Sequence, residues 1–387
     1  MERSCSLAPE MRAQRFEPFD VFIPILKSPN AKRVDSMSEI RSLLEKLSNA
    51  HGISGWEGSV LQIVRDEITP YVDDVRIDGF GNLIATKNGE KPSIMIGAHA
   101  DEIGLMVKYI EEKGFIRFIR IGGWFDQTLL NQRVIIHTKL GPIFGVVGSK
   151  PPHAMKEEER KKPVESKDMF IDVGCQSKKE VENLGIVAGT PISMDRTFAP
   201  LQGDRVTGKA FDNRAGLVVM IEALKRTKAK STIYLVGTVQ EEIGLKGAKV
   251  SAFDLNPDIA LATDVTVPGD HPGIEMKDAP LEMGKGPVVV VADASGRGIL
   301  TAPKVIDWLV GTAKEFDIPI QLEASDGGGT TDGNAIQTTR SGIMTGVLSV
   351  ATRYIHSPVE VLSLNDIEQA AELVARAMET APRYFGR

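Results

Sequence analysis

The sequence predicts an α/β protein, built on a mixed, largely parallel sheet flanked by helices, with a small β-barrel domain inserted into it. From about residue 196 onward, apolar strand-like runs alternate with amphipathic helical segments, which is the pattern of βαβ units. Between residues 105 and 194, short β-rich runs follow one another with glycine or proline in nearly every gap. Such spacing is typical of a small barrel or sandwich.

The chain therefore divides into three expected parts. Residues 37–104 and 195–387 form one α/β domain, and residues 105–194 form the inserted β-rich domain. Residues 1–36 mix charges, prolines and single apolar residues without a period of 2 or 3.6. We expect them to be a non-catalytic N-terminal extension, either a mobile arm or the consequence of a misassigned start, with Met37 as the true initiator.

The first α/β segment is predicted to run helix, helix, strand, strand. Its first helix begins near Met37, and residues 60–68 form the second. The buried face of the first helix would carry Ile40, Leu43, Leu44 and Leu47. The apolar run 93–98 suits a strand that is buried on both faces.

The inserted domain is predicted to be almost entirely β. Its expected strands are 105–110, 115–121, 133–138, 143–148, 169–173 and 191–194. One helix is expected at 178–184, and the Lys/Glu-rich stretch 156–167 reads as a solvated loop or short helix.

The second α/β segment contains the remaining strands and helices. Strands are expected at 232–240, 258–265, 287–292 and 342–350, and helices at 211–224, 301–316 and 365–381. The inward face of the last helix would carry Ile367, Ala370, Ala371, Val374 and Met378.

Composition excludes several classes of protein. Of 387 residues, 46 are Lys or Arg and 52 are Asp or Glu, so the net charge of -6 gives no global footprint for nucleic acid. Two cysteines, Cys5 and Cys175, are too few for a disulfide scaffold or a cysteine zinc cluster. No apolar run approaches the ~18 residues of a membrane span. We expect a cytoplasmic protein without nucleic-acid or membrane partners.

Acidic and histidine side chains gather where the predicted strands end. They are His99 and Asp101, Glu241 and Glu242, Asp264, His356 and, at a helix start, Asp212. Taken singly, each has an ordinary structural explanation, such as an N-cap or a solvated edge. Together they matter, because ligands bind beyond the carboxyl ends of strands in open α/β sheets and buried charges are usually paired or bound to metal.

Four ordered motifs carry a family resemblance. They are His99-Ala-Asp-Glu-Ile-Gly104, Lys209-Ala-Phe-Asp-Asn-Arg-Ala-Gly216, Glu241-Glu-Ile-Gly-Leu-Lys-Gly-Ala248 and Arg353-Tyr-Ile-His-Ser-Pro358. From Met37 onward the chain resembles the TET or deblocking (glutamyl) aminopeptidases, dinuclear metallo-enzymes of which some members have been labelled endoglucanases. The resemblance implies a catalytic metallopeptidase domain and an inserted β-barrel dimerisation domain.

The resemblance also implies roles for individual residues. His99 and Asp264 would bind one divalent ion, Glu242 and His356 a second, and Asp212 would bridge them. Glu241 would be the general base, and Asp101 would orient His99. Two ions per subunit, Zn²⁺ or Co²⁺, suit nitrogen and oxygen ligands without thiolates. One departure is Thr331-Asp-Gly-Asn-Ala335, where the family commonly has Thr-Asp-Ala-Gly-Ala, and it bears on specificity.

The function expected is removal of N-terminal residues from short peptides by a homo-oligomer, a dodecamer built from dimers. The alternative is a glycoside hydrolase with paired carboxylates, which would leave His99 and His356 without a role. A two-metal phosphohydrolase would need a cationic cradle for phosphate that no motif near the strand ends provides. A non-catalytic assembly module would have no use for Glu241 beside a full ligand set.

Overall fold

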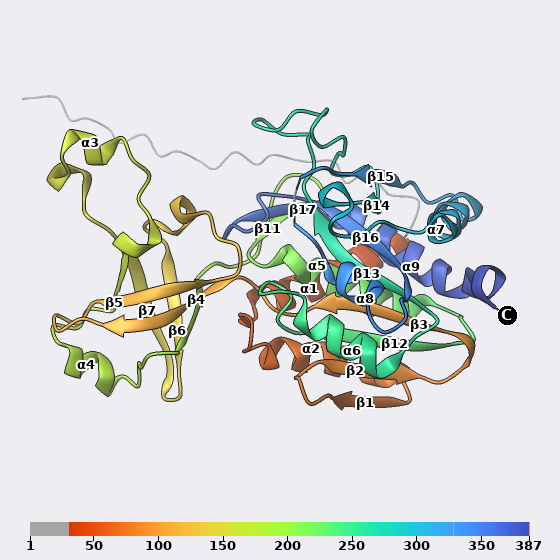
Figure 1. Cartoon of the computed structure of the whole chain (residues 1–387), viewed down its shortest axis with the longest axis horizontal. Coiled ribbons are helices and arrows are strands. Elements are labelled where there is room, and N and C mark those ends of the chain that lie inside the picture. Colours follow the sequence, from red (N-terminus) through yellow and green to blue (C-terminus); the bar gives the residue numbers. More distant parts are fainter. Residues whose placement is uncertain (1–30, 328, 387) are drawn as a thin grey trace, which may run out of the picture.

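The computed structural model describes residues 31–327 and 329–386 as an α/β domain from which a separate β-barrel projects (Figure 1). This arrangement confirms the fold class predicted from the sequence. None of the helices in the described ranges is both long and apolar enough to cross a membrane.

The α/β domain is centred on a mixed sheet, eleven-stranded within the described residues. Its main path is β1 (Asp74–Ile77), β2 (Leu83–Lys87), β12 (Ser231–Thr238), β3 (Glu90–His99), β13 (Ile259–Thr266), β16 (Met344–Arg353), β17 (Glu360–Ser363), β11 (Arg205–Gly208) and β10 (Ala199–Pro200). β14 (Val288–Ala292) pairs with β16, and β15 (Gln321–Ala324) pairs with β14. The four strands β12, β3, β13 and β16 are mutually parallel, and antiparallel strands flank them.

Helices cover both faces of this sheet. The larger core lies under α1 (Ala31–Asn49), α2 (Gly58–Ile68), α5 (Phe211–Arg226), α7 (Pro303–Glu315) and α9 (Leu364–Phe385). The opposite face carries α6 (Lys246–Leu255) and α8 (Asp332–Gln337) over a smaller apolar cluster. All five side chains predicted to face inward on the last helix are buried. α5 is buried along most of its length, as expected of a helix enclosed by others.

The predicted start of the first helix is wrong by six residues. α1 begins at Ala31, not near Met37, so the last part of the proposed extension is helical. Residues 1–30 of that extension lie outside the described residues. Ser36 is joined to the domain, since its hydroxyl donates to Glu368 at 2.8 Å and accepts from Arg226 at 3.1 Å.

The barrel closes in the order β4 (Gly104–Ile110), β5 (Ile116–Ile121), β8 (Phe170–Asp172), β7 (Gly141–Gly148), β6 (Arg133–Thr138) and β9 (Pro191–Met194). It has its own apolar core, separate from that of the sheet. The expected helix is α4 (Lys178–Asn183), and the Lys/Glu-rich stretch contains the short α3 (Glu157–Arg160). β4 and β9 are the strands by which the chain enters and leaves the barrel (Figure 1).

Several elements were not predicted. The first α/β segment contains three strands, because β1 and β2 form an antiparallel hairpin before β3. α6 and α8 were missed because each is short and contacts the sheet mainly through small residues, such as Ala248 and Ala252 of α6. Their stability comes from packing, since isolated helices of this length are marginal in water.

Candidate metal centre and active site

The carboxyl ends of the parallel strands meet at one edge of the sheet, and the predicted polar residues converge there. His99 ends β3 beside Thr238 at the end of β12, which Glu241 and Glu242 follow. Asp264 lies near the end of β13, and His356 follows β16. Parallel register delivers these side chains to a common rim, as in other open α/β sheets.

Asp212 occupies the middle of the cluster. It lies in the irregular first turn of α5, and its two carboxylate oxygens face different histidines. Asp212 Oδ1 is 3.1 Å from His99 Nε2, and Oδ2 is 3.3 Å from His356 Nε2. A single carboxylate placed between two imidazoles has the arrangement that a bridging metal ligand requires.

The remaining carboxylates divide between the two histidines. Glu242 Oε2 lies 3.3 Å from His356 Nε2, and Asp264 Oδ1 lies 3.9 Å from His99 Nε2. Glu241 Oε2 is 3.8 Å from the same His99 atom. Two groups of possible ligand atoms, each within 4.8 Å, result: His99 with Glu241 and Asp264, and His99 with Asp212 and Glu242. Proximity alone therefore does not separate Glu241, the expected base, from the ligands.

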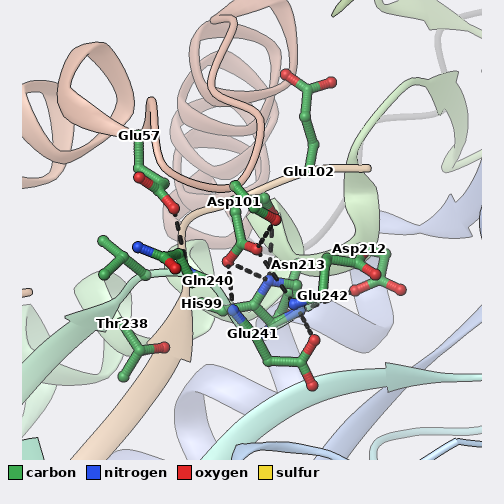
Figure 2. Close-up of polar contacts among 12 residues, drawn as sticks. Glu57, His99, Asp101, Glu102, Asp212, Asn213, Thr238, Gln240, Glu241 and Glu242 are labelled. Atoms are coloured by element: carbon green, nitrogen blue, oxygen red, sulfur yellow. Dashed lines mark hydrogen bonds and ion pairs between the residues drawn. The ribbon is translucent and has the colours of Figure 1, made fainter. Parts of the chain in front are cut away.

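Asp101 supports the cluster from behind (Figure 2). Its backbone oxygen lies 3.1 Å from His99 Nδ1, which fixes the ring. Its carboxylate accepts the backbone N–H groups of Glu241 and Glu242 at 3.0 and 3.1 Å, and the Ser54 hydroxyl at 2.6 Å. Although burial opposes ionisation, these donors and His99 hold the pKa of Asp101 below its usual value. Asp101 thus orients both His99 and the Glu241–Glu242 segment.

The electrostatics of the cluster indicate excess negative charge. Burial, together with nearby carboxylates, raises the pKa of Asp264 and Glu241 well above the usual range. Burial disfavours protonation of His356, yet hydrogen bonds to Asp212 and Glu242 raise its pKa to about 11. Raised pKa values of both carboxyl groups and neighbouring imidazoles indicate that the negative charge of the cluster is not balanced by cations.

The donor set fits divalent ions. It offers imidazole nitrogen and carboxylate oxygen, and no thiolate, which suits Zn²⁺, Co²⁺ or Mn²⁺. Two ions contribute four positive charges, against three negative charges from Asp212, Glu242 and Asp264. The residues present therefore fit divalent cations in donor type and in the sign of their charge.

Residues that the sequence analysis missed hold the cluster in place. Glu360 on β17 is buried, and its carboxylate accepts the backbone N–H of Asp212 at 3.0 Å and that of His356 at 3.1 Å. Burial, and secondarily the charge of Asp212, raises the pKa of Glu360 well above its usual value. The available signal was a charged residue at an inward position of a short strand, four residues after His356.

A cavity of about 810 Å³ opens in front of the cluster. Its walls come from the segments after β13, β14 and β15 and from the loop before α8. Thr331, in the motif that differs from the family's usual sequence, lines the cavity. The next residue, Asp332, does not line it, and its carboxylate accepts a hydrogen bond from the Thr238 hydroxyl. Burial raises the pKa of Asp332 to about 6.

Two of the other histidines and two tryptophans have structural positions. His51 and His137 both contact the Ser193 hydroxyl, at 2.8 and 2.7 Å, where the barrel meets the α/β domain. Trp308 is fully buried in the main core, and Trp124 donates to the carbonyl of Gly104 at 2.9 Å. We therefore assign none of these four residues to the metal cluster.

Comparisons with known proteins identify relatives of this chain. A family model described as M42 glutamyl aminopeptidase matches residues 81–373. A putative aminopeptidase of Acetivibrio thermocellus is 41% identical over 337 residues, covering 87% of this chain and 97% of the relative. Aminopeptidase APDkam598 from the archaeon Desulfurococcus kamchatkensis has TM-score 0.86 at 42% identity, covering 90% of this chain and 97% of that chain. The Pyrococcus horikoshii TET1 peptidase, which can assemble into a tetrahedron or a large octahedral shell, has TM-score 0.79 at 33% identity, with 88% and 99% covered.

Proposed function

Because the chain belongs to the M42 glutamyl aminopeptidase family, and is therefore a peptidase, we propose that it removes N-terminal residues from short peptides by a dinuclear metal mechanism. The observation that carries this proposal is the position of Asp212 between His99 and His356. The cofactor would be two divalent ions per subunit, Zn²⁺ or Co²⁺.

The proposed ligand assignment is the one that the family resemblance implies, and the contacts are compatible with it. His99 and Asp264 would hold one ion, Glu242 and His356 the other, and Asp212 would contact both. When bound, the ions would polarise the scissile carbonyl and lower the pKa of a water shared between them. Glu360 and Asp101 would keep the ligand-bearing segments in register through the backbone hydrogen bonds described above.

Glu241 would act as the general base. Its Oε2 atom lies 3.8 Å from His99 Nε2, whereas the ion pairs of His356 among the described residues go to Asp212 and Glu242. It would take a proton from the attacking water and pass it to the peptide nitrogen as the carbon–nitrogen bond breaks.

Neighbouring glutamates provide a matched test of these roles. Glu241→Gln should retain its metal and lower kcat by ~10²-fold or more, the scale of a lost general base. Glu242→Gln should lose metal, because it removes a charged ligand. Metal analysis and hydrolysis of aminoacyl chromogenic substrates on both variants check the assignment. Loss of metal from Glu241→Gln, or full occupancy in Glu242→Gln, would contradict it.

A chelator separates the peptidase from the glycoside hydrolase alternative. Removal of metal should abolish aminopeptidase activity, and added Zn²⁺ or Co²⁺ should restore it. A hydrolase that relies on two carboxylates alone would keep its activity in the chelator. Activity on a polysaccharide that survives chelation would support that alternative over the peptidase assignment.

We also propose that the barrel is the dimerisation domain and that dimers assemble into a dodecamer. Large apolar side chains on the outside of the barrel support this role, including Phe125 and Phe144, both 65% exposed, and Val146 next to Phe144 on the same face of β7. Exposed apolar side chains that gather in one patch mark interaction surfaces. If the assembly encloses the active sites, only short or unfolded peptides would reach them.

Light scattering tests the assembly. The wild-type protein should have the mass of about twelve subunits, and Phe144→Glu should reduce it. Phe253→Glu is the control, since Phe253 is similarly exposed at 57% but lies on α6, away from the barrel. A fully active monomer at micromolar concentration would contradict the proposed role of the barrel.

A further inference from the structure

The cavity beside the metal cluster carries more acid than the ligand scheme requires. Besides the proposed ligands and Glu241, its lining includes Asp278, Asp293, Glu323 and Asp326. Among the described residues that line it there is no lysine or arginine. Two basic side chains on neighbouring segments have partners of their own: Lys277 pairs with Glu275, and Arg297 donates to the carbonyl of Ala294.

Glu323 is the best placed of these acids. It lies on β15 opposite Val290 of β14, which also lines the cavity. The Thr266 hydroxyl donates to Glu323 Oε1 at 2.9 Å and fixes the side chain. Within the described part of the chain, the second oxygen, Oε2, has no hydrogen-bond or ion-pair partner. Glu323 is half-buried, so this oxygen is available to a group inside the cavity.

Asp293 stands behind Glu323 in the same wall. It is 8% exposed, and its Oδ1 atom accepts the backbone N–H of Ile299, while Oδ2 has no partner among the described residues. Burial, followed by the charge of Asp293, raises the pKa of Glu323, and burial also raises that of Asp293. Two adjacent carboxylates without a cation favour a positively charged ligand.

The distance from the metal cluster to Glu323 is comparable to the length of a long substrate side chain. Asp264 and Thr266 are two residues apart on β13, which is about 6.6 Å along a strand. Thr266 in turn holds Glu323. An N-terminal residue whose carbonyl lies at the metal cluster would reach Glu323 with the end of a long side chain.

We propose that Glu323, backed by Asp293, selects peptides whose N-terminal residue is lysine or arginine and disfavours an acidic one. This inference rests on the proposed aminopeptidase function and assigns its substrate class. A basic side chain supplies the missing cation and hydrogen-bond donors, whereas a glutamyl side chain adds a further negative charge to the wall.

The test compares lysyl, arginyl, leucyl and glutamyl p-nitroanilides. In the wild-type enzyme, kcat/KM should be highest for the basic substrates and lowest for the glutamyl one. Glu323→Gln should lower the lysyl-to-leucyl ratio of kcat/KM by ~10-fold, because it removes one partner of a partly desolvated charge pair. Glu282→Gln is the control, since Glu282 is exposed near β15 and does not line the cavity.

The outcomes separate this inference from the function on which it rests. A preference for the glutamyl substrate would overturn it. An unchanged lysyl-to-leucyl ratio of kcat/KM in Glu323→Gln would also overturn it. This includes the case in which kcat/KM falls equally for all four substrates, because Glu323 would then bind the α-amino group that they share. Absence of hydrolysis of every substrate would contradict the aminopeptidase function itself.

The inference can also be tested on the unmodified enzyme, so that it does not depend on a variant that folds. Raising the ionic strength should lower the wild-type lysyl-to-leucyl ratio, because salt screens a charge pair at a solvent-connected site. A ratio independent of salt, together with leucyl preference, would overturn the inference without any substitution.

Discussion

A buried ion pair joins the two segments that carry His99 and Asp212. Lys209 Nζ lies 2.9 Å from both carboxylate oxygens of Glu102 and 2.8 Å from the carbonyl of Ala50. Both side chains are almost fully buried. Burial raises the pKa of Glu102, but Lys209 and Arg214 outweigh it and hold that pKa below the usual value. Burial lowers the pKa of Lys209, and we take the pair as charged at neutral pH because Glu102 contacts both cations.

Lys209→Met removes one partner and leaves Glu102 buried. Breaking a buried pair in this way costs about 3–5 kcal/mol. Arg214 remains 3.6 Å from Glu102, and the Gly52 N–H still donates to it at 3.0 Å, so the lower end, about 3 kcal/mol, applies here. Lys91→Met is the control, because Lys91 pairs with Asp258 at 2.7 Å but is 72% exposed. Exposed pairs contribute about 0–1 kcal/mol.

Urea denaturation of the full-length chain, at one protein concentration, measures both variants. The expected result is a much lower midpoint for Lys209→Met and a nearly unchanged one for Lys91→Met. Glu102→Gln combined with Lys209→Met should recover part of the loss, since no uncompensated charge stays buried. Equal, small shifts for the two lysine variants would refute the reasoning, because burial would then not decide the energy of the pair.

Two further predictions concern the metals and pH. Asp212→Ala should lower metal content more than His356→Ala, since a bridging ligand contacts both ions; full occupancy of either variant in metal analysis would contradict the ligand scheme. Burial, aided by Lys209, lowers the pKa of His51 to about 4 from 6.5, so the unfolded chain binds more protons between these values. The stability from neutral His51 is complete above pH 6.5 and lost as pH falls toward 4; His51→Gln should flatten the dependence of the urea midpoint on pH in this window, and an unchanged slope would assign the dependence to other groups.

The alternation of strands and helices, the inserted β-rich block and the polar residues at strand ends could all be predicted from the amino-acid sequence. These are local features, because a strand shows its apolar run and its polar end within about ten residues. The four motifs also identified the family correctly. The individual metal and catalytic roles stay predictions, since they depend on ions and protons that local pattern does not reveal.

The way in which distant segments support the site is visible only in the folded chain. Glu360 fixes the backbone of Asp212, and Lys209 neutralises Glu102 from a segment 107 residues away. Glu323 of β15 lines the cavity because the fold places this strand beside it. In the sequence each of these is one charged residue among many. Burial and the identity of its partner give it a role, and both arise from contacts between residues far apart in the chain.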